Sequence, residues 1–344
     1  MDTGAAEHRG GEPDGGTPPA LQVARGVWRI TTPLPYRPPR VHAYLAELPR
    51  HGFLLVDGGL GTQEAWSALD AGVRAAAGGW DAVAVHVVTH MHMDHVGLAA
   101  RVRTASGAPV LMGRLDAERM AHAAAAPDEE AAYRAALLLR CGAPADFVAA
   151  VEGLQRGARA VAPPVQVDGI LDGEAGPVPG APGWSWVWTP GHTAGHVSLF
   201  RPGDAVLVAG DAVLPRITPT LGVNRQRADP VGDYVGALDR LRALEPGVVL
   251  PGHGEPPADP AGRIAELRAA AQGETATVAG LLDAGAATVW ELVDRRYPGR
   301  ELGASTRTLA LRETLAHLER LAAAGDARVG RGEDGAERYR AAAV

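Results

Sequence analysis

The stretch that decides the fold is Thr89-His90-Met91-His92-Met93-Asp94-His95, which places four candidate metal ligands within seven residues. It directly follows residues 82–88, an apolar run rich in Val that predicts a buried strand. A loop at the end of a strand can direct several side chains to one point. Because so dense a cluster of His and Asp is rarely an ordinary polar turn, the stretch predicts a metal site.

Three more candidate ligands follow strand-like runs further along the chain, each beside a glycine. His192 follows residues 184–188, Asp211 follows residues 205–208, and His253 follows residues 248–250. Taken singly, each is explained equally well by a structural turn. Together with the first cluster they supply five histidines and two aspartates, which is enough for two metal ions.

The pattern of strands and helices indicates an α/β protein. Residues 114–159 are rich in Ala and predict two or three helices broken at Pro127 and Pro144, so we expect a helical insertion there. Further strands are predicted at 27–30, 41–48, 53–56, 109–112 and 197–200, and further helices at 62–77 (with Thr62 as N-cap), 96–104 and 233–244.

A change of pattern after Pro260 predicts a separate C-terminal domain. Helices are expected at 261–283, 289–297 and 305–324, followed by a hairpin that pairs 328–330 with 337–340. Three helices and a hairpin suggest a winged-helix-like appendage. The expected organisation is a disordered tail at 1–24, a catalytic domain at 25–260 and this appendage at 261–344.

Composition narrows the class of protein. The 344 residues include one cysteine, Cys141, so an intrachain disulfide and a zinc site built on thiolates are both excluded, and we expect Cys141 to be a small core residue. No membrane helix or signal peptide is predicted, so a cytoplasmic location is expected. All 33 basic residues are Arg, which indicates compositional bias, and the net charge of −7 argues against a broad nucleic-acid surface.

The run His90-Met91-His92-Met93-Asp94-His95 resembles the HxHxDH signature of the metallo-β-lactamase superfamily, and the other motifs match in order over about residues 25–260. The resemblance implies an αββα sandwich with two divalent metal ions at one edge. Zinc fits such ligands, and iron or manganese fits them too. By the family pattern, one metal is held by His90, His92 and His192, the other by Asp94, His95 and His253, with Asp211 bridging and Asp57 orienting ligands from outside.

The same resemblance implies a hydrolase that uses a metal-bridging hydroxide as nucleophile. Asp94 and Asp211 are then catalytic, and His196 is a candidate to contact substrate or ligand, with a purely structural role as the alternative. The chain departs from the family at two places. His42 stands where the family often has Asn, and Ala212 stands where many relatives have His.

The substrate is the least determined feature. Residues 189–196 resemble the glyoxalase II branch, whereas the appendage resembles that of the β-lactamase-like protein 2 endoribonucleases. We favour hydrolysis of a small-molecule acyl-thioester or ester. The alternatives are a lactonase, an endoribonuclease or other phosphodiesterase, and a DNA-binding regulator. Residues 261–344 hold twelve Arg and twelve Asp or Glu, which disfavours a nucleic-acid partner. The insertion at 114–159 either covers the metals and binds an acyl or carrier group, or serves as a homodimer face or a scaffold helix.

Overall fold

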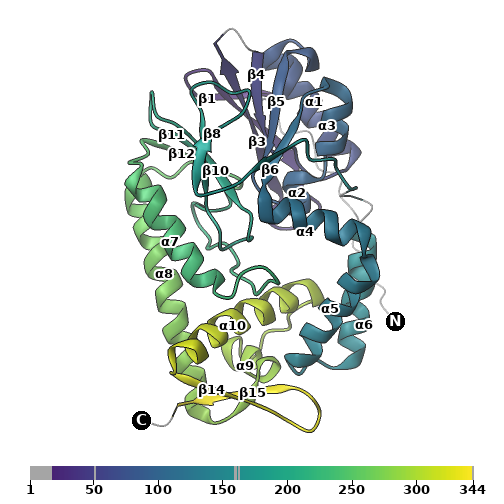
Figure 1. The fold of residues 1–344 in the computed structure, drawn as a ribbon, viewed down its shortest axis with the longest axis vertical. Helices are drawn as coiled ribbons and strands as arrows, with labels where there is room; N and C mark the ends of the chain where they lie inside the picture. The colour runs from purple at the N-terminus through teal and green to yellow at the C-terminus, as the bar shows by residue number, and fades with distance from the viewer. Residues whose placement is uncertain (1–17, 50–51, 159–160, 162, 343–344) are drawn as a thin grey trace, which may run out of the picture.

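The computed structural model describes residues 18–49, 52–158, 161 and 163–342. Two β-sheets pack face to face in the upper half of Figure 1. The first sheet has the order β1 to β7, with antiparallel neighbours as far as β4 and parallel neighbours beyond it. Its strands are β1 (Leu21–Ala24), β2 (Val27–Pro33), β3 (Arg40–Leu48), β4 (Gly52–Val56), β5 (Val83–Val88), β6 (Val110–Gly113) and β7 (Gly169–Leu171).

The second sheet has the order β12-β11-β10-β9-β8. Its strands β11 and β12 are parallel, and the other pairs are antiparallel. They are β8 (Ala175–Pro177), β9 (Ser185–Trp188), β10 (Val197–Arg201), β11 (Val206–Gly210) and β12 (Val248–Pro251). The strands predicted from apolar runs are all present, whereas the short strands β1, β7 and β8 were not predicted.

The first strand corrects the predicted start of the catalytic domain. Residues 1–17 of the expected tail lie outside the described residues, but residues 21–24 form β1, in which Gln22 lies opposite Trp28 of β2. The sheet therefore begins before the predicted boundary at residue 25. Four residues, two exposed and two half-buried, are too few to show a period-2 pattern, so only the pairing with β2 identifies this strand.

Four layers make up the sandwich and confirm the predicted αββα architecture. Between the sheets, side chains such as Leu54 and Val87 pack against Trp186 and Leu199. Helices α1 (Gln63–Ala77) and α3 (Ala99–Ser106) cover the outer face of the first sheet. Helices α7 (Pro230–Ala243) and α8 (Pro260–Gly280) cover that of the second. Thr62 caps α1 as predicted, since its hydroxyl accepts from the backbone N–H of Ala65.

The helix predicted at 96–104 is divided into two pieces. Helix α2 (Met93–Val96) ends before Gly97, and α3 begins at Ala99. Gly97 passes so close to the chain at Gly61 that an added Cβ would lie 2.5 Å from the Gly61 nitrogen. This close approach requires glycine, and it packs α2, which carries two candidate ligands, against the loop after β4.

The predicted helical insertion is present as three helices. They are α4 (Arg114–Ala125), α5 (Pro127–Arg140) and α6 (Ala145–Ala158), with Pro127 as the first residue of α5 and Pro144 just before α6. In Figure 1 they descend from the sandwich along one side of the molecule to the C-terminal helices. Cys141, between α5 and α6, is buried in an apolar cluster, as expected.

The C-terminal domain contains the predicted helices and hairpin. Its elements are α9 (Val289–Arg296), α10 (Ala304–Ala324) and a small sheet of β13 (Ala287–Thr288), β15 (Glu337–Ala341) and β14 (Ala327–Arg331). Helix α8 connects the two parts and packs against both α7 and α10. One apolar cluster runs from the outer face of the second sheet through α8 to α10, so the two domains share a core. Among the described residues, no helix is long and apolar enough to cross a membrane.

Candidate metal centre

The seven candidate ligands come from loops at the same edge of the sandwich. His90 and His92 follow β5, Asp94 and His95 lie on the short helix α2, and His192 follows β9. Asp211 and His253 follow β11 and β12, whose carboxyl ends meet because these two strands are parallel. The structure thereby brings together residues that lie up to 163 positions apart in the chain.

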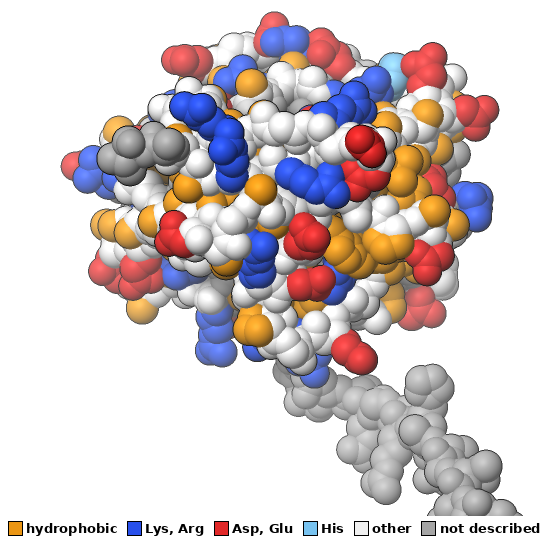
Figure 2. Space-filling model, turned by 90° about the horizontal axis from the view of Figure 1, so that it is seen from below, with side chains coloured by type: hydrophobic (Ala, Val, Ile, Leu, Met, Phe, Trp, Pro, Cys, Tyr) orange, Lys and Arg blue, Asp and Glu red, His pale blue; other side chains and the backbone are white. Residues whose placement is uncertain are grey.

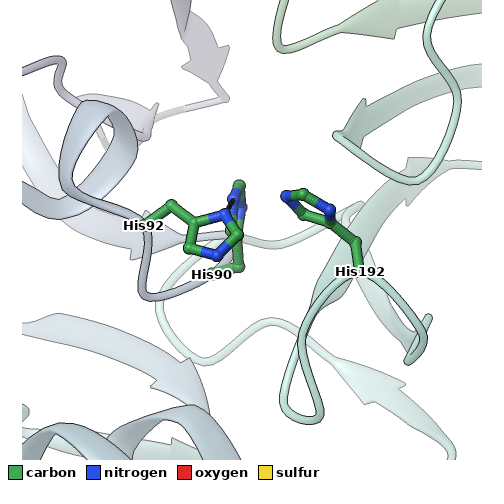
Figure 3. Close-up of side chains that lie close together, drawn as sticks. All are labelled: His90, His92 and His192. Atoms are coloured by element: carbon green, nitrogen blue, oxygen red, sulfur yellow. Dashed lines mark hydrogen bonds between the residues drawn. The ribbon is translucent and has the colours of Figure 1, made fainter. Parts of the chain in front are cut away.

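Three overlapping groups of donor atoms lie at this edge, each with its atoms within 4.8 Å of one another. Figure 3 shows the first group, in which His90 and His92 from one loop face His192 from the opposite loop. The Nε2 atom of His90 lies 3.1 Å from Nδ1 of His92. The other two groups are His90, His95 and Asp211, and then Asp94, His95 and His253.

Asp211 lies between the two sets of histidines. Its Oδ1 is 3.5 Å from His95 Nε2, and its Oδ2 is 3.5 Å from His192 Nε2 and 3.7 Å from His253 Nε2. Asp94 extends the second set, with Oδ2 3.4 Å from His253 Nε2. The carboxylate of Asp211 therefore lies close to histidines of both sets.

Hydrogen bonds on the far side of the rings fix the orientation of the histidines. Nδ1–H of His95 donates to Asp57 Oδ2 at 2.8 Å, that of His192 to the Thr220 carbonyl at 3.0 Å, and that of His253 to the Arg40 carbonyl at 2.8 Å. Each ring is thus held in the tautomer whose Nε2 lone pair faces the centre. Asp57, to which the family resemblance assigns the orienting of ligands, contacts the ring of His95 on this far side.

The centre also contains polar atoms that no protein group satisfies. Among the described residues, His95 Nε2, His192 Nε2 and Asp211 Oδ1 are buried and have no hydrogen-bond partner. Buried polar atoms are nearly always paired, so three orphaned atoms at one point indicate a missing partner. Imidazole nitrogens and a carboxylate oxygen are ligands that zinc, iron and manganese accept, so these residues fit a metal site.

The electrostatics of the centre favour a bound cation. Burial lowers the pKa of His90 well below its usual value, and the neighbouring His95 adds to this shift. Burial would also lower the pKa of His95, but the carboxylates of Asp211 and Asp57 outweigh it and raise that pKa to about 10. The carboxylates thus hold positive charge at this point, and a divalent ion supplies that charge while leaving the imidazoles neutral.

His196 and His42 are buried and have protein partners at both ring nitrogens. Nε2 of His196 accepts from the backbone N–H of Asp211 at 3.1 Å, and its Nδ1 lies 2.7 Å from the Thr189 hydroxyl, with the ring fully buried. His42 is 3.0 Å from Thr31 Oγ1 and donates to the Gly254 carbonyl at 3.0 Å. Both histidines contact loops that carry candidate ligands. For His196 the geometry therefore favours a structural role over contact with substrate.

Asp116 is a residue of the site that the sequence did not reveal. Its fully buried carboxylate accepts hydrogen bonds from Met91 N at 2.9 Å, Thr193 Oγ1 at 2.6 Å and Gly195 N at 2.7 Å. It therefore joins the loop of His90 and His92 to the loop of His192. Burial raises the pKa of Asp116 to about 6 against the effect of these three hydrogen bonds. The only local signal was its place just after an apolar strand.

A cavity of about 610 Å³ opens beside the centre, where His92 and His192 form part of its wall. The insertion and the C-terminal domain supply much of the remaining wall. Most of the lining is apolar, including Met93, Met120, Leu137, Leu138, Val223 and Leu309. The cavity thus gives a ligand access to the candidate metal site.

Comparison with known families and proteins supports this interpretation of the site. Residues 36–253, which include all seven candidate ligands, match the model of the "Metallo-beta-lactamase superfamily". Residues 275–342 match the "Metallo-beta-lactamase-like, C-terminal domain". The probable metallo-hydrolases YqjP and YflN of Bacillus subtilis are each 28% identical to this chain. The YqjP match covers 86% of this chain and 92% of YqjP, and the YflN match covers 69% and 86%.

Solved structures extend the likeness to nearly the whole chain. A metallo-beta-lactamase family protein from Thermus thermophilus superposes with a TM-score of 0.77 at 33% identity, covering 93% of this chain and 100% of that one. A beta-lactamase domain protein from Burkholderia ambifaria also gives 0.77, at 27% identity and 94% coverage of both chains. The motifs, the layered fold and these matches lead to one conclusion: this chain belongs to the metallo-beta-lactamase superfamily.

Proposed function

We propose that this protein is a dinuclear metal-dependent hydrolase of small-molecule acyl-thioesters or esters. The names of its Bacillus relatives, probable metallo-hydrolases, support the reaction class. The proposed ligands of one ion are His90, His92 and His192, and those of the other are Asp94, His95 and His253, with Asp211 shared. Two bound divalent ions supply a hydroxide nucleophile near neutral pH and polarise the carbonyl oxygen of the substrate.

The observation that carries the choice of substrate is the apolar cavity beside His92 and His192. Methionine side chains, three of which line it, adapt to the shape of a flexible acyl chain. Burial of that chain would hold the scissile carbonyl at the metal centre and exclude bulk water from the cavity. An RNA backbone carries one negative charge per nucleotide, whereas this mostly apolar lining offers three arginines, of which Arg119 and Arg134 are already paired with carboxylates.

The leaving group follows from the hydrogen bonds of the two extra histidines. His196 and His42 have both ring nitrogens engaged by protein groups, so neither is available to protonate a leaving group. A thiol has a pKa of about 8.5 and leaves as the thiolate far more readily than an alcohol leaves as the alkoxide. This difference favours thioesters over other esters and over phosphodiesters.

The C-terminal domain supports substrate binding better than DNA binding. We propose a winged-helix-like fold for it, because β13 precedes α9 and α10, and the β14–β15 hairpin follows them. Helix α10 would be the DNA-reading helix, but it packs against α6, α7 and α8. Figure 2, which views this end of the molecule, shows Arg and acidic side chains interspersed on the face drawn. The proposed likeness to the glyoxalase II branch lies in the residues 189–196 alone.

A substrate panel tests the proposal. Purified protein loaded with zinc, iron or manganese is assayed against acyl-thioesters, lactones, a cephalosporin and bis-p-nitrophenyl phosphate. We expect kcat/KM to be highest for a thioester and the activity to disappear in His92→Ala. Efficient cleavage of RNA or of the phosphodiester, with every thioester untouched, would contradict the proposal. A preference for lactones would support hydrolysis at a carbonyl group but contradict the proposal that the leaving group is a thiolate.

A further inference from the structure

Helix α10 of the C-terminal domain places one arginine, Arg312, in the wall of the cavity that opens on His92 and His192. The loop after β11 holds this side chain in place. Arg312 Nη2 donates to the Val223 carbonyl at 3.0 Å, and the main-chain carbonyl of Arg312 accepts from Val223 N at 3.2 Å. An added Cβ on Gly222 would lie 3.2 Å from Arg312 Cβ, a tight contact, so glycine at this position leaves room for the Arg312 side chain.

The charge of Arg312 is not neutralised by an ion pair in the described parts of the chain. No carboxylate oxygen there lies within 4 Å of its guanidinium, although the other two arginines of the cavity wall are both paired. Glu130 is the carboxylate whose charge acts on Arg312. Glu130 is itself within ion-pair distance of Arg119, Arg134 and Arg225. The cavity wall holds three guanidinium groups and one carboxylate, a formal charge of +2.

An arginine in such a position needs an explanation. Taking an unpaired guanidinium out of bulk water is unfavourable unless a partner satisfies it, and its fork of donors matches a carboxylate or phosphate. The single Val223 carbonyl uses one of its five N–H groups. The remaining donors are not among the buried unpaired atoms of the described residues, which is consistent with their facing the cavity.

We propose that Arg312 binds an oxyanion carried by the substrate, a carboxylate or a phosphate, in the cavity that opens on His92 and His192. This inference rests on the proposed function, since the same cavity delivers the substrate to the metal centre. The substrate class is thereby an acyl-thioester or ester that also carries an anionic group. The C-terminal domain is then part of the substrate site, and Arg312 determines specificity.

Matched substrates test this assignment. Pentanoyl and glutaryl thioesters of N-acetylcysteamine differ by a terminal carboxylate on the acyl chain, and the pentanoyl thioester of 4′-phosphopantetheine carries a phosphate on the thiol. We expect one anionic substrate to exceed the neutral one about 10- to 100-fold in kcat/KM, mainly through KM, because a hydrogen bond to a charged group contributes about 1.5–3 kcal/mol. The better of the two anionic substrates identifies the carboxylate or the phosphate as the group bound.

Arg312→Met should abolish that preference, so that kcat/KM falls at least about 10-fold more for the preferred anionic substrate than for the neutral one. Arg312→Lys keeps the positive charge but loses the forked pair of guanidinium donors, so it should retain part of the preference for the anionic substrate. Arg320→Met is the matched control, since it removes an arginine two turns along α10 that pairs with Asp229 and does not line the cavity. Equal activity of the wild type on all three substrates, or equal loss on neutral and anionic substrates in Arg312→Met, would overturn the assignment.

A binding measurement separates this inference from the proposed hydrolysis. Octanesulfonate is an apolar chain with an anionic head that is a weak ligand for zinc, so calorimetric titration of the metal-loaded protein with it reports on Arg312. We expect binding near one per chain, weakened at least about 10-fold in Arg312→Met and unchanged in Arg320→Met. If no thioester is cleaved but this pattern holds, the hydrolysis proposal fails and the anion site stands. Equal binding by all three proteins rejects the anion site.

Discussion

At the scale of single residues, the centre depends on groups that hold the ligands as much as on the ligands themselves. Asp57 accepts from His95 Nδ1 and from Thr89 N, and so connects the end of β4 to the end of β5. The hydroxyl of Thr89 donates to Asp57 and lies 3.0 Å from His90 Nδ1. One carboxylate thereby orients two of the histidines. Such outer contacts typically change metal affinity 10- to 100-fold when they are removed.

Asp116 gives the first prediction at this scale. Asp116→Ala leaves three buried donors unpaired, so we expect it to lower the free energy of unfolding by about 2–4 kcal/mol and metal affinity by about 10- to 100-fold. Asp116→Asn keeps one carbonyl acceptor and should fall between Ala and the wild type. Chemical denaturation and competition with a metal chelator measure the two effects.

The control for this prediction lies on the same helix. Glu118→Ala removes an exposed carboxylate of α4 that pairs with Arg114, and its effect should stay within about 0.5 kcal/mol. If Asp116→Ala binds metal as tightly as the wild type, Asp116 does not position the two ligand loops.

At the scale of elements, the packing of α10 against α8 contains a titratable contact. His317 of α10 is buried, and its Nδ1 lies 2.9 Å from the Thr275 hydroxyl of α8. Burial lowers its pKa to about 4, and the charges of Arg296 and Arg320 act in the same direction. Between pH 6.5 and 4 the unfolded chain therefore binds a proton that the folded chain excludes, so this group makes stability fall as the pH falls.

His317→Gln tests that contact. The glutamine does not titrate, so the loss of stability between pH 6.5 and 4 should be smaller than in the wild type by about 2 kcal/mol. Urea denaturation at several pH values measures the difference. His122→Gln, which replaces a histidine with an exposed side chain, is the control. Identical pH profiles for wild type and His317→Gln would show that His317 is not held neutral in the fold.

The sequence predicted the candidate ligands and the apolar strands better than it predicted the short elements. The ligands follow strongly apolar strands in local motifs, so the sequence predicted both the strands and the seven residues that the structure brings together. Strand β1 has four residues that are half or fully exposed, and its extended conformation is stabilised by antiparallel pairing with β2. The break at Gly97 depends on the contact with Gly61, which no local pattern shows.

Long-range contacts account for the site residues that were not predicted. Arg312 reaches the cavity from a helix about two hundred residues after His92, in a chain whose basic residues are all arginine. Nothing in its local sequence distinguishes it from the arginines that form surface ion pairs. Asp116 likewise meets Gly195 only because the two sheets pack together. Both residues are identified by their partners, which sequence periodicity does not supply.

At the scale of the whole molecule, the shared core predicts that the two domains unfold together. Leu311 of α10 is fully buried in the cluster that also contains Leu241 of α7 and Leu138 of the insertion. Leu311→Ala should cost about 2–5 kcal/mol and shift one cooperative transition to a lower temperature. Differential scanning calorimetry measures this shift, with Leu309→Ala, a half-exposed neighbour, expected to cost less. Two transitions, with only the smaller one shifted, would show instead that the domains unfold independently.

The central claim is that seven side chains from separate loops form one binuclear metal site, and metal content tests it most directly. Elemental analysis of the purified, metal-loaded protein should give about two divalent ions per chain. Asp211→Ala should lose binuclear occupancy, because Asp211 is the only described carboxylate within 3.7 Å of histidines from both sets. A wild-type protein without bound metal, or full metal content and full activity in Asp211→Ala, would contradict the account.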